Sequence, residues 1–144
     1  MRLTEAEARR RLADARIARL ATVRADGRPH IVPIVFAVEG ERLYSIADPK
    51  PKDGPELLRF RNIEANRAVS VLADEYDEDW ERLWWVRADG VARVARDGPE
   101  RDRTIELLRS KYSQYASWAT PFGAAMVIDI GHWASWKLAS DDPA

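Results

Sequence analysis

Short runs of apolar and β-branched residues, separated by turn-forming pairs, recur along most of this chain and constrain its fold more than any other feature. The first three runs cover residues 16–23, 30–38 and 42–47. An Asp-Gly pair at 26–27 and a Glu-Gly pair at 39–40 separate them, and such pairs favour the tight turns of antiparallel hairpins. The sequence therefore predicts that the sheet begins as a three-stranded meander.

Pro33 interrupts the second of these runs. Proline has no N–H group to donate to a strand ladder. We therefore expect Pro33 on an edge strand, at a bulge, or where another group approaches the backbone.

The remaining runs complete a mainly β fold. Further strands are predicted over 68–74, 83–94, 124–130 and 132–138, with the last two forming a hairpin around Gly131. Helices are predicted from Thr4, which forms a capping box with Glu7, to about Ala15, and over 56–66 and 98–112. Six or seven short strands with two or three helices indicate an antiparallel barrel flanked by helices. Without a linker or repeat, residues 1–144 are expected to form a single domain.

Composition excludes several classes of function. The chain has no cysteine, so it carries neither disulfides nor thiolate metal sites, and it suits a reducing compartment such as the cytoplasm. A net charge of −1 argues against a general nucleic-acid surface. No apolar run is long enough to span a membrane or to act as a signal peptide. Its two histidines form no recognisable metal-binding motif, so no metal site is expected.

Two of the four lysines flank a proline in Lys50-Pro51-Lys52, ahead of the helix predicted over 56–66. Proline stiffens this segment, and the helix start adds free N–H groups and a positive dipole end. Asp53 is a plausible cap for that helix, with Pro55 near its first position. The segment is predicted either to bind a phosphate group or to be a solvated loop.

Several motifs in order resemble one family, from about residue 16 to 96. They are ARLATVRADGRPHIVPIVFAVEGERLYSIADPKPK, then NRAVSVLAD, then LWWVRADGVARV, with weaker support from the closing IDIGHWASWKL. The chain resembles the pyridoxamine 5′-phosphate oxidase-like proteins of the FMN-binding split β-barrel type. In particular it resembles the branch that uses the deazaflavin coenzyme F-420.

The resemblance implies a homodimer with a flavin-like cofactor in a groove at the subunit interface. Lys52 matches the basic residue that grips the cofactor phosphate, and Lys50 lies beside it. The strand along the ring system matches Val32, Pro33 and Ile34, and the strand end near the phosphate-bearing chain matches Ser45 and Ile46.

Trp85 marks a departure from the flavin mononucleotide oxidases of this family. Those oxidases have a glutamine before their VR-x-x-G pattern, which here is Val86 to Gly90. The substitution points away from oxidase chemistry. Trp133 and Trp136 resemble the region through which a partner subunit closes the pocket, so Trp136 joins Trp85 among the expected cofactor contacts.

The family resemblance fits the few acid–base side chains of the chain, because a deazaflavin carries the hydride itself. The expected activity is that of an F-420-dependent oxidoreductase, acting as a reductase, that passes hydride to a small conjugated or heteroaromatic acceptor. No catalytic residue is identified; possible proton donors are His30, Tyr44, Tyr112 and Tyr115. Alternatives are a flavin mononucleotide enzyme, or a non-catalytic flavin, deazaflavin or haem binder in which His30 or His132 would ligate haem.

Residues 74–81, with the sequence DEYDEDWE, concentrate six carboxylates in eight residues. They lack the spacing of a calcium loop, which favours a solvated connection; the alternative is a lid that disfavours anionic substrates. The adjacent residues Trp84 and Trp85 lie on a predicted strand and must point to opposite faces.

Overall fold

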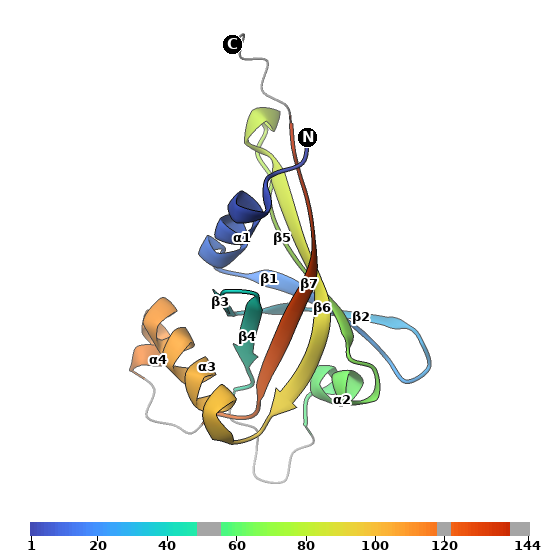
Figure 1. Ribbon diagram of the computed structural model, residues 1–144, viewed down its shortest axis with the longest axis vertical. Helices are drawn as coiled ribbons and strands as arrows, with labels where there is room; N and C mark the ends of the chain where they lie inside the picture. Colours follow the sequence, from blue (N-terminus) through green and yellow to red (C-terminus); the bar gives the residue numbers. More distant parts are fainter. Residues whose placement is uncertain (49–55, 118–121, 139–144) are drawn as a thin grey trace.

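A computed structural model of the chain describes residues 1–48, 56–117 and 122–138 (Figure 1). Its strands are β1 (Ala18–Val23), β2 (Pro29–Ile34), β3 (Ala37–Glu39), β4 (Arg42–Ile46), β5 (Ala68–Glu75), β6 (Trp84–Ala95) and β7 (Ala125–Lys137). Its helices are α1 (Glu5–Asp14), α2 (Leu58–Ala65), α3 (Gly98–Lys111) and α4 (Ser113–Ala116), with one 3-10 turn, η1 (Trp80–Arg82).

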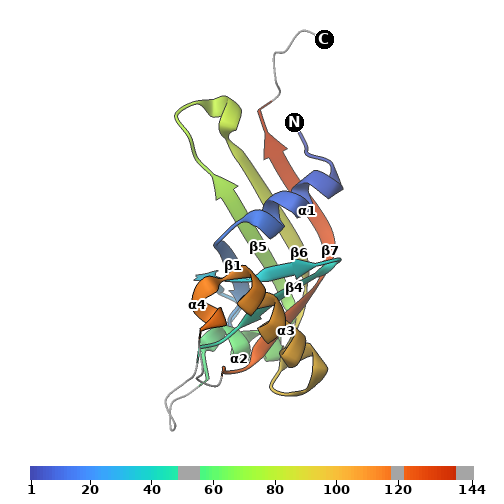
Figure 2. The ribbon, with the colours of Figure 1, turned by 90° about the vertical axis from the view of Figure 1, so that its left-hand side faces the viewer.

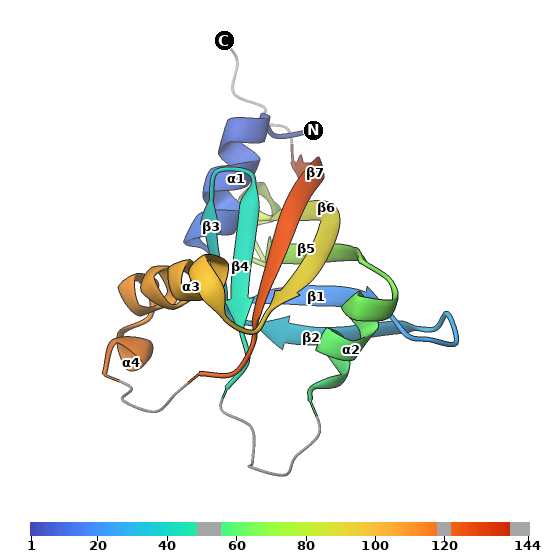
Figure 3. The same cartoon turned by 60° about the horizontal axis from the view of Figure 1, so that its bottom comes forward.

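The strands form one antiparallel sheet in the order β2-β1-β5-β6-β7-β4-β3. The sheet coils so strongly that β1 and β2 run across the direction of β3 and β4 (Figure 3). The predicted mainly β fold of six or seven antiparallel strands with flanking helices is confirmed, and the short α4 adds a fourth helix in the described residues. Pro33 lies on β2, an edge of this sheet, as expected.

The predicted meander is wrong, because the run 30–38 divides into two strands. β2 pairs with β1 at one edge of the sheet, whereas β3 pairs with β4 at the other. Phe36 lies in the connection, fully buried, and its N–H and C=O groups both bond the Tyr112 hydroxyl, at 3.1 and 3.0 Å. The crossover therefore depends on a contact with Tyr112, a residue far along the chain. The mostly apolar run 30–38 does not by itself predict this division into two strands.

The predicted hairpin around Gly131 is also wrong, because β7 continues through this residue. Asp89 pairs with His132 and Gly90 with Ile130, so β7 holds one extra residue here, a β-bulge at Gly131. The extra residue reverses the alternation along β7. Ile128 and Ile130 face the core before the bulge, and Trp133 packs against the same core after it.

The helix starts were predicted with mixed success. Thr4 caps α1 as expected, since its hydroxyl accepts the N–H of Glu7 at 3.2 Å. α2 begins at Leu58 rather than near Pro55, and its N-cap residue Leu57 offers no side-chain hydrogen bond. The expected cap, Asp53, lies outside the described residues.

The core lies inside the barrel and under α1, which crosses β5, β6 and β7 (Figure 2). Its fully buried side chains include Leu12, Leu20, Phe36, Leu43, Val71, Val86 and Ile128. α3 and α4 cover a second cluster beside β3 and β4, which contains Leu108, Tyr115 and Phe122. Leu108 lies one helical turn from Ile105, as the apolar spacing of that helix predicts.

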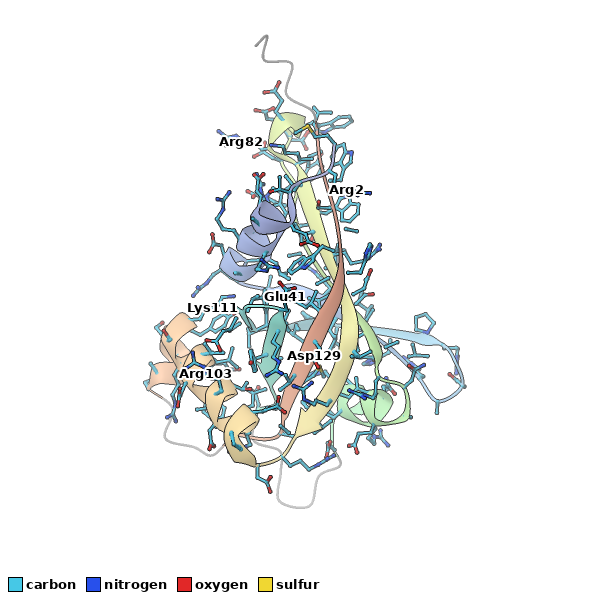
Figure 4. All side chains as sticks on the ribbon, viewed as in Figure 1. Arg2, Glu41, Arg82, Arg103, Lys111 and Asp129 are labelled. Atoms are coloured by element: carbon cyan, nitrogen blue, oxygen red, sulfur yellow. The ribbon has the colours of Figure 1, made fainter. Side chains whose placement is uncertain are left out.

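Lys111 ends α3 with its ammonium group partly buried near the end of α1 (Figure 4). Its Nζ donates to the carbonyl of Ala15 at 2.7 Å and lies 4.0 Å from the centre of the Phe36 ring. Burial lowers the pKa of this ammonium group to about 8 from an ordinary value of 10.5, and the neighbouring charge of Arg16 acts in the same direction. Lys111 therefore carries its charge at a cost to the folded state.

The free energy of unfolding should consequently rise with pH between about pH 8 and 10.5. Between about pH 8 and 10.5 the unfolded chain holds a proton on Lys111 that the folded chain has released. The free energy of unfolding then increases with pH, and the penalty is fully present below pH 8. Urea unfolding from pH 7 to 10 should show this rise, and Lys111→Met should lose it. If the free energy of unfolding changes with pH equally in the two proteins, the fold does not lower the pKa of Lys111.

Candidate functional site

The outward face of the sheet carries the most unusual group of side chains in the structure. Along β6, Val86 and Ala88 are buried inside the barrel, so Trp85, Arg87 and Asp89 point to the other face. Strand register brings neighbours to them on that face: Asp74, Leu72 and Ser70 from β5, and Trp136, Ala134 and His132 from β7. In the described residues, no helix covers the upper part of this face (Figure 1, right side of β5 to β7).

A polar cluster lies in the middle of this face. The carboxylate of Asp89 accepts the Ser70 hydroxyl at 2.6 Å and two N–H groups of Arg87 at 2.9 and 3.2 Å. Partial burial alone would raise the pKa of Asp89, but the hydrogen bonds from Ser70 and Arg87 outweigh it and lower that pKa. Arg87 and Asp89 therefore neutralise each other at neutral pH.

A cleft of about 450 Å³ opens on the same face, between the β5–β6 hairpin and the end of β7. Its lining residues are Leu72, Asp74, Glu75, Tyr76, Leu83, Trp84, Trp85, Arg87 and Trp136. Tyr76 is 66% exposed and Trp136 is 37% exposed, which is unusual for aromatic side chains of this size. The cleft therefore combines an aromatic wall with two carboxylates and one paired guanidinium group.

The two tryptophans expected at the cofactor meet across β6 and β7. Trp85 is the register partner of Trp136, so the two indoles belong to one face. Trp84 packs against the core and donates its Nε1–H to Glu75 at 2.9 Å. Trp133 and Trp136 both follow the bulge and stand three residues apart on β7, so strand alternation turns Trp133 inward and Trp136 outward.

The three residues expected along the ring system divide between the faces of β2. Ile34 is buried and Val32 is partly buried against the core, whereas Pro33 is exposed. Strand alternation therefore leaves Pro33 as the one side chain of the three on the outward face.

Ser45 and Ile46, expected near the phosphate-bearing chain, are both buried at the end of β4. The Ser45 hydroxyl donates to the carbonyl of Val35 at 2.8 Å. Ser45 thus fixes β4 against the crossover between β2 and β3. Its side chain is not displayed on the surface of the chain.

Lys50 and Lys52 lie outside the described residues, but the residues on either side of them are described. The Tyr115 hydroxyl of α4 lies 3.4 Å from a carboxylate oxygen of Asp48. Burial, with the negative charge of Asp48 adding to it, raises the pKa of Tyr115 to about 12. Burial also lowers the pKa of Arg59, although Asp48 and Tyr115 oppose that effect. Arg59, Asp48 and Tyr115 therefore interact with one another close to the ends of the lysine segment.

The proposed proton donors differ in what surrounds them. Nδ1 of His30 is buried without a hydrogen-bond partner, and Tyr44 is buried. The Tyr112 hydroxyl is bonded to the crossover and to the Arg16 carbonyl. Of the three tyrosines, Tyr115 is the one beside the lysine segment.

The acidic segment closes the β5–β6 hairpin as a short structured turn. Asp77 accepts the N–H of Asp79 at 2.7 Å, and Asp79 accepts the N–H of Glu81 at 3.2 Å, which caps η1. Within the described ranges, no group of three or more His, Asp or Glu side chains could hold a metal ion. No helix in the described part of the chain is long and apolar enough to cross a membrane.

Sequence reasoning missed the polar cluster and the apolar cleft. Arg87 and Asp89 stand two residues apart on one strand, so their shared face could have been predicted. Ser70, Leu72 and Trp136 reach the same face only through strand pairing, which the sequence did not reveal.

Comparisons with known proteins agree on the fold. A family model described as pyridoxamine 5′-phosphate oxidase matches residues 4–137. The 5a,11a-dehydrotetracycline/5a,11a-dehydrooxytetracycline reductase of Streptomyces rimosus is 30% identical over 104 residues, which cover 69% of this chain and 72% of that protein.

Two solved structures illustrate the structural match. An FAD-binding protein of Mesorhizobium loti is 26% identical with a TM-score of 0.68, over 94% of this chain and 95% of that one. A conserved hypothetical protein of Mycobacterium tuberculosis is 20% identical with a TM-score of 0.75, over 94% and 85% of the two chains. The second likeness supports the fold alone.

Proposed function

Because the chain belongs to the pyridoxamine 5′-phosphate oxidase family, we propose that it is a homodimeric oxidoreductase of the cytoplasm that uses a flavin-type cofactor. The cofactor that we propose is coenzyme F-420, with the protein acting as a reductase. Two features favour the deazaflavin. Trp85 replaces the glutamine of the flavin mononucleotide oxidases, and the matching relative of Streptomyces rimosus is named as a reductase. A flavin, such as flavin mononucleotide, is the alternative, because a solved neighbour is described as FAD-binding.

The observation that carries this proposal is the uncovered outward face of the sheet. It offers Pro33, Trp85 and Trp136, which suit a flat conjugated ring, and the cationic lysine segment suits a phosphate. This donor set fits a cofactor with a ring system and a phosphate-bearing chain. The exposed aromatic side chains of this face also suit contact with a second subunit, which would close the groove.

In this proposal the side chains of the protein bind and orient, and they exclude water. Lys52, helped by Lys50, holds the phosphate group, and the end of β4 at Ser45 and Ile46 supports the segment that carries them. Val32, Pro33 and Ile34 form the strand along the ring, with Pro33 contributing its side chain. A bound deazaflavin supplies hydride, so the chain needs only to hold the acceptor at reacting distance. Tyr115 is the proposed proton donor closest to the lysine segment.

The acceptor that we propose is a conjugated or fused-ring compound. The relative of Streptomyces rimosus is named for a fused-ring substrate, and the cleft beside Trp85 and Trp136 has an aromatic lining. Its volume of about 450 Å³ lies in the range of roughly 300–1,000 Å³ that is usual for small-molecule sites.

Titration with oxidised coenzyme F-420 and, separately, with flavin mononucleotide tests the proposal. Tryptophan fluorescence, corrected for inner-filter absorption, reports binding. Coenzyme F-420 should bind more tightly than flavin mononucleotide. Lys52→Ala should weaken its binding roughly tenfold, about 1.4 kcal/mol, through loss of the phosphate contact.

Lys137→Ala is the matched control, because Lys137 ends β7 at the opposite end from Ala125, the register partner of Ile46. Its cofactor affinity should equal that of the wild type. Tighter binding of flavin mononucleotide would move the assignment to the flavin branch. Binding of neither, or sedimentation as a monomer at micromolar concentration, would contradict the proposal.

A further inference from the structure

We propose that the cleft between the β5–β6 hairpin and the end of β7 binds a flat aromatic cation, and that this cation is the acceptor substrate. The inference rests on the proposed function in taking the ligand to be the acceptor, which would lie beside the cofactor ring and share the indoles of Trp85 and Trp136 with it. The cation cleft is the cleft of about 450 Å³ described above, whose lining residues include Leu72, Asp74, Leu83, Trp85, Arg87 and Trp136.

Shape and lining point to a planar apolar body. The wall of the cation cleft consists of the indoles of Trp85 and Trp136 with the aliphatic side chains of Leu72 and Leu83. The two indoles come from register-paired positions, so a flat ring can contact both at once. Trp136 and Tyr76 remain well exposed in the chain, so apolar surface is available for a ligand to bury.

The unmatched charge in the cation cleft is negative. Arg87, the one cation among the described residues that line it, donates two hydrogen bonds to Asp89. Asp74 has only a long contact with Arg19, at 3.7 Å. Glu75, the register partner of Trp84, accepts the Trp84 Nε1–H and also borders the inner side of the hairpin, where Arg11, Arg82 and Lys137 lie, so Asp74 is the carboxylate that register places on the outward face.

The surroundings strengthen this negative field. The turn beyond Glu75 adds four further carboxylates from residues 77–81, against the single cation Arg82, which Figure 4 labels near the tip of the hairpin. On the inner side of the hairpin, Arg11 is engaged by Glu7 at 3.1 Å and lies over the Trp84 ring. An aromatic wall attracts cations through its ring faces, so lining and charge favour the same ligand.

This proposal favours the alternative interpretation of residues 74–81, in which they disfavour anionic substrates. A cationic aromatic ligand gains from Asp74 and from the indoles, whereas an anion of the same shape is repelled by the Asp74 carboxylate and meets no free cation among the described lining residues. Charge selection of this kind works by repelling the wrong partner as well as by attracting the right one.

Calorimetric titration with three two-ring probes of similar shape tests this proposal: 1-methylquinolinium, quinoline and 1-naphthoate. The protein is titrated first without cofactor and then saturated with oxidised coenzyme F-420. The cation should bind at least tenfold more tightly than 1-naphthoate, with quinoline between them, in both states. Trp136→Ala should weaken binding of all three at least fivefold.

Asp74→Asn should reduce the preference for the cation over 1-naphthoate while leaving quinoline binding unchanged. This variant keeps the shape of the side chain, so it tests the charge preference of the cleft even if Trp136→Ala folds poorly. Trp80→Ala is the control, because Trp80 is an exposed tryptophan of the same hairpin that does not line the cleft. Its probe affinities should match those of the wild type.

Equal binding of the cation and 1-naphthoate would overturn the charge argument. Absence of binding in a sample that sediments as a dimer would also overturn the proposal, because a second copy would then cover the cleft. Displacement of the cation by coenzyme F-420 would assign the cleft to the cofactor. Cation binding in a protein that binds neither cofactor would leave the ligand site intact and refute only the proposed function.

Discussion

Gly90→Ala is expected to lower the free energy of unfolding by about 3 kcal/mol, because this position has no room for a side chain. A Cβ atom here would overlap the carbonyl oxygen of Asp129 and come within 3.0 Å of its carbonyl carbon and of Ile128 Cγ2. Two of these atoms belong to the backbone of the neighbouring strand, so the clash cannot be relieved by a rotamer change. The strands would have to separate where β6 and β7 pass the bulge.

Gly131→Ala provides the matched control, since Gly131 lies in the same bulge but opens onto empty space. Its backbone does not adopt the left-handed conformation that favours glycine. We expect a change of less than about 1 kcal/mol for this variant. Urea unfolding of both variants measures the difference, and equal losses would show that the bulge, rather than the close approach at Gly90, limits substitution.

Features set by neighbouring residues could be predicted from the sequence. The turns at Gly27 and Gly40 have positive φ angles of 87° and 61°, in keeping with their turn-forming pairs. The cap at Thr4 and the long helix α3 follow equally local signals. Their free energy comes from hydrogen bonds and dihedral preferences within a few residues, which a single sequence displays directly.

Features set by distant residues could not be predicted. The run 30–38 contains Pro33 but no turn-forming pair, yet it divides at Phe36, because Tyr112 binds the crossover from more than seventy residues away. The continuous strand through Gly131 depends likewise on pairing with β6. A glycine beside a histidine fits a turn or a bulge equally well when the partner strand is unknown.

The candidate site was predictable to the same partial extent. The family resemblance predicted Trp85 and Trp136 as cofactor contacts, and the strand register places them side by side on the outward face. It also selected Ser45, Ile46 and Ile34, whose side chains the chain buries. Resemblance identifies positions along a strand, but strand alternation and the bulge decide which side chains face a ligand.

Phe36→Ala is expected to destabilise the fold by about 3–5 kcal/mol. Phe36 is fully buried where the chain crosses between the two edges of the sheet, and its ring supports the Lys111 ammonium group at 4.0 Å. A domain of this kind has a total stability of about 5–15 kcal/mol, so the loss is a large share of it. Urea unfolding checks the value, and Phe36→Leu, which keeps most of the volume, should lose much less.

The same variant separates a structural role from a positioning role. Phe36 adjoins Val35, whose carbonyl accepts the Ser45 hydroxyl, so the crossover joins the β2 edge that bears Pro33 to the β4 end that precedes the lysine segment. Leu12→Ala, at a fully buried position of α1, serves as the stability-matched control. If the crossover positions the proposed cofactor site, Phe36→Ala should weaken coenzyme F-420 binding in the folded protein, whereas Leu12→Ala should not. Equal affinities in the two variants would show that Phe36 stabilises the barrel without aligning the site.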